Sequence, residues 1–87
     1  MSETELIHRA RRGDSAAWEV LVSSHQEAVF RLAYLLLGDA SDAEDVAQET
    51  FIRAFRFLAR FDETRNWRPW LLSIAANLTR NRRRSVG

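Results

Sequence analysis

The residues of this chain best suited to chemistry are amides, aromatic rings and arginines in its C-terminal third. Positions 65–84 contain six arginines and no acidic residue, interspersed with tryptophan and asparagine. Spacings of three and four residues would place one group of these side chains on a single helix face. Amides and guanidinium groups bind base edges and phosphates, and aromatic rings stack on bases, so this face indicates contact with nucleic acid. The group consists of Trp70, Ser73, Asn77, Arg80, Asn81 and Arg84.

A second stripe, in the middle of the chain, carries the opposite charge. Positions 39–49 contain five acidic residues and no basic one. The residue types allow two interpretations: a solvated face with its acids near a helix N-terminus, or a docking surface around an apolar residue with a polar rim. Both remain open on composition alone. At helical spacing the stripe consists of Asp45, Gln48, Glu49, Ile52 and Arg56.

Catalysis and metal binding are not indicated by the sequence. His8 and His25 fall on separate predicted helices, without a cysteine or a second histidine at ligand spacing, and no glycine-rich phosphate loop is present. The acidic cluster lacks the glycine and the ligand order of a calcium loop. We therefore expect no enzyme, no cofactor and no metal site, and we interpret His25 as a surface or helix-bend residue.

Length and composition indicate one small globular domain. The 87 residues are 46% hydrophobic and 29% charged, with a net charge of +1, which is not typical of a disordered segment. The absence of cysteine excludes disulfides and thiolate metal sites. The acidic N-terminus does not resemble a secretory signal, and no apolar run is long enough to span a bilayer. We predict a soluble, cytoplasmic protein without membrane insertion.

Two helices are expected ahead of the acidic stripe. A short helix over residues 2–13 opens with a capping box and ends at a glycine. A long helix then begins at Asp14 or Ser15 and ends at Gly38, a natural C-cap. The run at 23–25 contains weak helix formers, which allows one bent helix or two separate helices, and one bent helix is preferred.

Two further helices would carry the polar faces. The third is predicted to start at Ser41, in a capping box with Glu44, and to extend to Arg60. After a polar loop at 61–66, Asn66 is expected to cap the fourth helix. Because no strand pattern is present, the predicted fold class is all-α, a compact bundle of four helices with a short first and a long second helix.

Three motifs occur in an order that resembles a known family. They are Asp42-Ala-Glu-Asp-Val-Ala-Gln-Glu-Thr-Phe-Ile-Arg-Ala-Phe-Arg, then Phe61-Asp, then Trp70-Leu-Leu-Ser-Ile-Ala-Ala-Asn-Leu. Together with residues 13–39, which match the family's first long helix, they resemble the second conserved region of bacterial sigma factors of the extracytoplasmic-function group. The resemblance covers nearly the whole chain.

The resemblance implies a role for each face. In this family the helix with the acidic motif docks on the clamp helices of the largest subunit of core RNA polymerase. The last helix and the loop before it engage the minus-ten promoter element on the nontemplate strand as it opens. The residues implied in polymerase binding are Asp45, Gln48, Glu49, Ile52 and Arg56.

The implied DNA-binding residues lie in the loop and the last helix. The segment from Phe61 to Trp67 would form a pocket for a flipped-out base. Asn77 stands where the family places a base-reading residue, and the arginines beyond it would hold phosphates or neighbouring base edges. The full implied set is Phe61, Asn66, Trp67, Arg68, Trp70, Ser73, Asn77, Arg80, Asn81 and Arg84.

The family also implies further partners and a further domain. Residues 1–87 would be a single region 2 domain, with 82–87 the start of a basic linker to a C-terminal domain absent from this chain. An anti-sigma protein that covers the same faces is a second expected partner. Two alternatives remain open: a helical bundle that binds only proteins, and a nucleic-acid binder without sequence preference.

Overall fold

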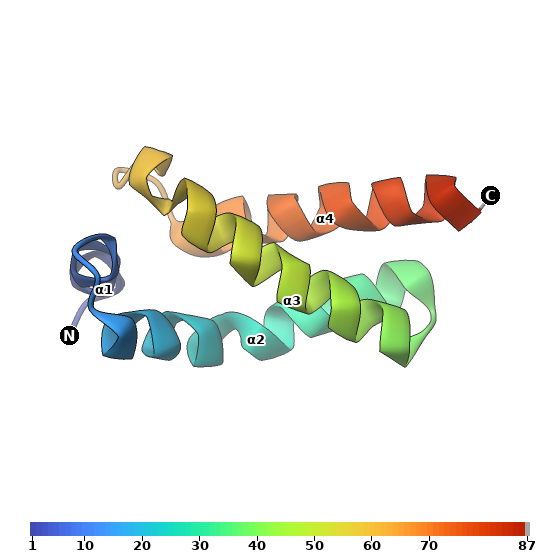
Figure 1. Cartoon of the computed structure of the whole chain (residues 1–87), viewed down its shortest axis with the longest axis horizontal. Coiled ribbons are helices and arrows are strands. Elements are labelled where there is room, and N and C mark those ends of the chain that lie inside the picture. Colours follow the sequence, from blue (N-terminus) through green and yellow to red (C-terminus); the bar gives the residue numbers. More distant parts are fainter. Residues whose placement is uncertain (87) are drawn as a thin grey trace.

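The computed structural model is built from four α-helices and one 3-10 turn. In chain order they are α1 (Glu3–Arg11), α2 (Ser15–Leu37), α3 (Ala40–Phe57), η1 (Leu58–Arg60) and α4 (Trp67–Val86). The structure describes the backbone of residues 1–86 and the side chains of residues 1–82, and that part of the chain contains no strand. The predicted all-α class is therefore confirmed. Figure 1 shows α1 set across one end of the three longer helices, with the C-terminus at the opposite end.

Capping residues fix where the first two helices begin and where α2 ends. Ser2 Oγ accepts a hydrogen bond from the Glu5 N–H at 3.2 Å, and the Asp14 carboxylate accepts two backbone N–H groups of α2 at 3.1 and 3.2 Å. These bonds satisfy donors that the first helical turn leaves unpaired. α2 ends at Gly38, whose φ of 72° lies in the left-handed region that glycine adopts without a Cβ clash.

The second and third helices settle two points that the sequence left uncertain. α2 is one uninterrupted helix of 23 residues, so the alternative of two separate helices is wrong. In α3, Asp39 and not Ser41 is the N-cap, because its carboxylate accepts the N–H of Asp42 at 2.9 Å. The predicted start was therefore too late. The α-helical part ends at Phe57, and the chain reaches Arg60 in the tighter 3-10 turn that commonly closes a helix.

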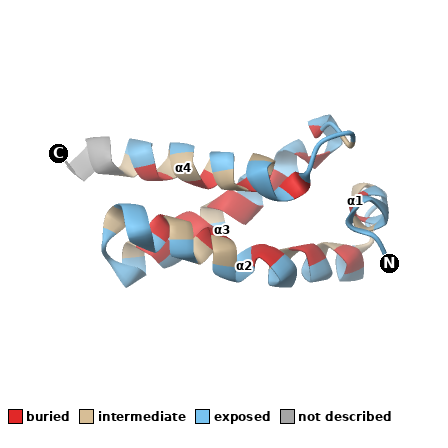
Figure 2. Cartoon of the chain, turned by 180° about the vertical axis from the view of Figure 1, so that it is seen from behind, coloured by how far each residue is buried: buried red, intermediate tan, exposed pale blue. Residues whose placement is uncertain are grey.

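The core forms along the faces by which α2, α3 and α4 meet (Figure 2). Leu21, Val29 and Leu71 have no exposed surface, and Trp67 is only 1% exposed. Burial of such side chains stabilises the fold by about 1.5–3 kcal/mol each. α4 is thereby held against the bundle by its inner face, and the described side chains of its outer face are exposed to solvent. None of the described helices is long and apolar enough to span a membrane.

Candidate functional site

The outer face of α4 presents the polar side chains that the sequence analysis singled out. Ser73, Asn77, Arg80 and Asn81 are exposed. Arg80 Nη2 donates to Asn77 Oδ1 at 2.9 Å, whereas Ser73 Oγ donates to a carbonyl of its own helix at 2.6 Å. Arg84 lies outside the side chains that the structure describes. The geometry thus joins an amide and a guanidinium on one exposed surface.

The aromatic residues expected to form a pocket for a flipped base lie in the core. Phe61 is 5% exposed and packs on Trp70, with 4.9 Å between ring centroids. Trp67 is surrounded by three rings at centroid distances of 5.0–6.2 Å. Asn66 and Arg68 are exposed, and Trp70 is partly buried. In this conformation Phe61 and Trp67 offer no open ring face to a base.

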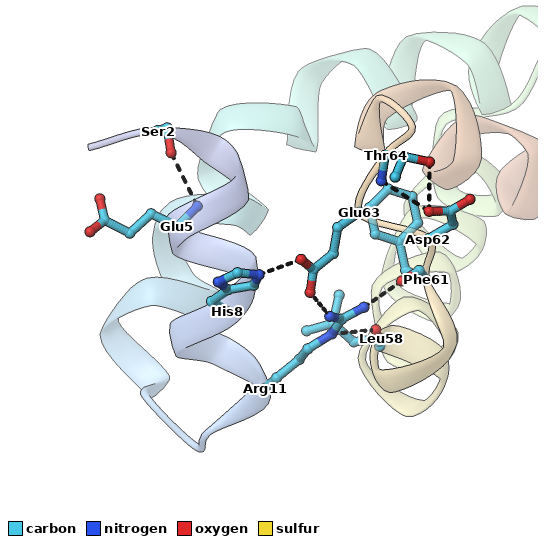
Figure 3. Close-up of polar contacts among 9 residues, drawn as sticks. All are labelled: Ser2, Glu5, His8, Arg11, Leu58, Phe61, Asp62, Glu63 and Thr64. Carbon is cyan, nitrogen blue, oxygen red and sulfur yellow. Dashed lines mark hydrogen bonds and ion pairs between the residues drawn. The ribbon is translucent and has the colours of Figure 1, made fainter.

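The loop over residues 61–66 is tied to α1 by a network centred on Arg11 (Figure 3). Arg11 Nε donates to the Leu58 carbonyl at 3.0 Å. Its other two nitrogens bond the Glu63 carboxylate and the Phe61 carbonyl. His8 Nε2 bonds the second carboxylate oxygen of Glu63. The position of the loop therefore depends on α1, which lies far from it in sequence.

The hydrogen bonds of this loop lower the pKa of two carboxyl groups. The pKa of Glu63 falls below its usual value chiefly because of the bond to His8, with Arg11 adding to the effect. The pKa of Asp62 is lowered by hydrogen bonds from the hydroxyl and the N–H of Thr64. Both carboxylates therefore favour the folded state when they are ionised.

We predict that Glu63→Gln makes the loss of stability in acid less steep. A lowered folded-state pKa contributes stability that is present above the unfolded-state pKa and is lost as the pH falls through the lowered value. Thermal unfolding followed by circular dichroism between about pH 3 and 7 checks this. Glu44→Gln, at an exposed position of α3 outside the network, is the matched control. If the melting temperatures of both variants fall equally as the pH is lowered, the prediction is contradicted.

His25, which the sequence analysis interpreted as a surface or helix-bend residue, is buried, so the surface assignment is wrong. The residue is 4% exposed. Its Nε2 lies 2.6 Å from a Glu3 carboxylate oxygen, and Arg68 Nε donates to its Nδ1 at 3.0 Å. Because a guanidinium only donates, Nδ1 is the unprotonated acceptor and Nε2 carries the proton. The imidazole thus joins the start of α1, the middle of α2 and the start of α4.

The described side chains contain no group of three or more His, Cys, Asp or Glu residues that could hold a metal ion. Both histidines are instead paired with single carboxylates, Glu63 for His8 and Glu3 for His25. Their partners lie 55 and 22 residues away in the sequence, so no local motif identifies these pairs.

The polar stripe of α3 is open to solvent. Ile52 is 47% exposed, which is unusual for an apolar residue among charges and suits a contact surface. Glu49 is partly buried and pairs with the arginine one turn later at 3.3 Å. The remaining residues of the predicted stripe are also exposed, namely Asp45, Gln48 and Arg56.

A groove of about 1240 Å³ between α2 and α3 adjoins this stripe and shares Gln48 and Ile52 with it. Phe55 in its wall is 56% exposed. An apolar trough with acidic edges suits a partner that offers apolar side chains flanked by basic ones. The aromatic lining residues are Trp18, Phe30, Phe51 and Phe55. The charged lining residues are all acidic: Asp14, Glu27 and Glu44.

The last described side chain of α4 reaches back to α3. Arg82 Nη2 donates to Asp42 Oδ1 at 2.9 Å and to Asp45 Oδ2 at 3.1 Å. All three side chains are at least 36% exposed, so each pair contributes only about 0–1 kcal/mol. The backbone stays helical to Val86. Residue 82 therefore belongs to α4. The linker to a further domain stays a prediction.

Known proteins similar to this chain come from one family. The Sigma-70 region 2 family model matches residues 21–87. The chain is 40% identical over 76 residues to the ECF RNA polymerase sigma factor SigW of Bacillus subtilis. It is 46% identical over 69 residues to the ECF RNA polymerase sigma factor SigE of Mycolicibacterium smegmatis. These matches cover 87% and 76% of this chain but 41% and 26% of the two relatives, so the chain spans less than half of their length.

A solved structure with the same fold contains nucleic acid. It is the NMR structure of an engineered region 2 of sigmaE in complex with GTAAAA. The TM-score is 0.90 at 34% sequence identity, over 98% of this chain and 88% of that chain. The likeness therefore extends over the whole bundle.

Proposed function

This chain belongs to the sigma-70 region 2 family, in its extracytoplasmic-function group, and from this premise we propose that it binds core RNA polymerase and recognises the promoter minus-ten element. In this proposal the domain captures the nontemplate strand as single-stranded DNA and so helps to melt the duplex. It acts in the cytoplasm as a transcription initiation factor and has no catalytic residues of its own. The two activities are assigned to different helices, DNA to α4 and polymerase to α3.

The exposed face of α4 is the observation that carries the DNA assignment. Asn77 and Arg80 lie joined on this face, and no acidic residue occurs between positions 65 and 84. With Oδ1 of Asn77 engaged by Arg80, its amide NH2 is the group left to donate to a base edge. Arg68, Arg80 and Arg84 are assigned to backbone phosphates, which position the strand without reading it.

The remaining residues of the predicted DNA-binding set have a supporting role in this proposal. Asn66 and Asn81 are exposed beside the arginines and are assigned to neighbouring base edges. The loop is held against the core by packing among three aromatic rings, those of Phe61, Trp67 and Trp70. The relative bound to GTAAAA supports single-stranded DNA as the ligand class.

The groove beside the α3 stripe supports the polymerase assignment. An acidic stripe alone is equally compatible with a solvated face, but the adjoining aromatic groove adds the apolar area that a protein interface requires. The clamp helices of the largest polymerase subunit would pair basic residues with Asp45 and Glu49. Gln48, Ile52 and Arg56 extend that contact.

A second candidate function is regulation by a protein that competes for the same groove. The aromatic lining and acidic edges favour a basic, amphipathic partner of any origin. An anti-sigma protein is the regulator that we assign to this position. Such a partner would hold the domain inactive by covering the surface that core polymerase needs.

We predict that Asn77→Ala weakens binding to single-stranded GTAAAA by about 2- to 13-fold, because the amide NH2 donates one hydrogen bond, which contributes about 0.5–1.5 kcal/mol. Fluorescence anisotropy at one fixed salt concentration measures this, with the complementary strand as the sequence control. Gln26→Ala is the control variant, since Gln26 is an exposed amide on α2 that lines the groove between α2 and α3. Equal binding to both strands would indicate phosphate attraction only, and no binding would leave protein docking as the function.

A further inference from the structure

Two residues of α1 hold the loop that precedes α4, and we call them the α1 clasp. They are His8 and Arg11, which bond different oxygens of the Glu63 carboxylate (Figure 3). Arg11 also bonds the backbone carbonyls of Leu58 and Phe61. Because a guanidinium carries its donors in a rigid planar fork, the three residues that Arg11 contacts are held in one fixed arrangement.

The rest of the loop forms a turn of its own. The Arg65 N–H donates to the Asp62 carbonyl at 3.0 Å. The Asp62 carboxylate accepts the N–H and the hydroxyl of Thr64 at 3.0 and 2.7 Å, which stabilises the turn. Asn66, which the proposed function assigns to a base edge, lies between this turn and the buried Trp67. The clasp on one side and Trp67 on the other therefore fix the position of Asn66.

The pair of Arg11 and Glu63 is more shielded from solvent than the surface ion pairs on α2 and α3. Its side chains are 21% and 33% exposed, whereas those of the two surface pairs are at least 46% exposed. Hydrogen bonds between ionised groups are stronger where less water competes for them. The clasp therefore constrains the loop more firmly than a surface ion pair would.

α1 has other contacts that keep it on the bundle. Ile7 and Ala10 are buried in the core, and Glu3 bonds His25 on α2 at 2.6 Å. Removal of the Arg11 side chain should therefore loosen the loop and leave α1 in place. The role of Arg11 can thus be tested without loss of the fold.

We propose that Arg11 is a positioning residue for the capture of single-stranded DNA. It contacts neither base nor phosphate, and it acts by holding the loop so that Asn66 meets the strand. A loop that is ordered before binding loses less conformational freedom when it binds. The inference rests on the proposed function and goes beyond it, because it gives α1, a helix assigned neither to DNA nor to polymerase, a part in DNA binding.

The test compares Arg11→Gln with Arg12→Gln in the 87-residue chain. Both variants lose one positive charge at the end of α1, but Arg12 is exposed and lies outside the clasp. Fluorescence anisotropy with GTAAAA at one fixed salt concentration should show an affinity about 2- to 12-fold lower for Arg11→Gln than for Arg12→Gln. Without DNA, the amide hydrogens of residues 62–66 should exchange faster in Arg11→Gln only, with exchange in α2 unchanged.

Double variants separate positioning from a general loss of stability. If Arg11 acts by placing Asn66, Arg11→Gln with Asn66→Ala should bind little worse than Asn66→Ala alone. When Arg11→Gln is combined with Asn77→Ala on α4, the two losses should multiply, because distant sites without shared partners act independently. Circular dichroism confirms that each variant is folded.

Three results would overturn the inference. In two of them the unmodified chain binds GTAAAA and the DNA function stands: Arg11→Gln binds as tightly as Arg12→Gln, or the losses of Arg11→Gln and Asn66→Ala multiply. In the third the unmodified chain binds no oligonucleotide, so the DNA function fails and the inference fails with it. Should Arg11→Gln unfold, Arg11→Lys replaces the fork by a single nitrogen, and an unchanged affinity of that variant overturns the inference equally.

Discussion

Reversal of two charges on α3, with Asp45→Lys and Glu49→Lys together, is expected to weaken binding to core RNA polymerase by about 30- to 1000-fold. Like charges placed against a basic partner cost on the order of 2–4 kcal/mol, which corresponds to that range of Kd. The fold should persist, because neither residue belongs to the buried core. The intramolecular partners that the variant loses, Arg82 and Arg53, form only exposed pairs of about 0–1 kcal/mol.

The measurement is a titration of fluorescently labelled domain with core polymerase, repeated with the isolated clamp helices. Glu5→Lys with Glu19→Lys carries the same change of net charge on α1 and α2, at exposed positions outside the groove, and serves as the control. If the α3 variant and the control bind alike, the stripe is a solvated face and the polymerase assignment fails.

Replacement of Trp67 by alanine is expected to lower the free energy of unfolding by about 3–5 kcal/mol. The indole is 1% exposed and packs against three other rings, so its removal leaves a cavity where α4 joins the bundle. A domain of this size has a total stability of only about 5–10 kcal/mol. Urea unfolding followed by circular dichroism should therefore show a variant close to the limit of folding.

This experiment separates a core role for Trp67 from a role in stacking on a base. A core residue lowers stability first, and DNA binding is lost only as the domain unfolds. A stacking residue would lose DNA affinity while stability stayed nearly unchanged. Trp67→Phe is the matched variant, because it keeps an aromatic ring in the core. It also removes the buried Nε1–H of Trp67, which has no hydrogen-bond partner and whose burial costs about 1–3 kcal/mol. Its destabilisation should be well below that of the alanine variant.

The sequence predicts best those features that residues close in the chain determine. Ser2 and Asp14 cap helices through N–H groups within three residues of them, and Gly38 ends α2 because its own backbone is left-handed. The three-and-four spacing on α3 likewise places Ile52 on an exposed face, as the structure has it. The start of α3 was missed, because two capping side chains, Asp39 and Ser41, stand two residues apart in the sequence.

Features that depend on distant residues were not predictable in this way. The Glu3 and Arg68 partners that make His25 a buried side chain lie 22 and 43 residues from it. Phe61 and Trp67 flank a polar loop, which suggests exposure, yet both rings turn inward because their burial stabilises more than their exposure would. Phe57, the last residue of α3, stays 39% exposed. Whether each of these rings is buried depends on packing against residues distant in the sequence, and the spacing of apolar residues along the chain does not predict that packing.

If a backbone phosphate also reaches Arg82, which lies between Arg80 and Arg84 in the sequence, the contact of Arg82 with Asp45 would link the two proposed activities thermodynamically. A cation of another protein that binds Asp45 competes with Arg82, and a phosphate that binds Arg82 competes with Asp45. Each ligand therefore removes the internal competitor of the other, and the resulting positive cooperativity is the same in both directions. Because the pair contributes at most about 1 kcal/mol, the gain is limited to a few-fold in affinity. In the proposed function, the two faces of the domain would then be coupled through Arg82 without any change of fold.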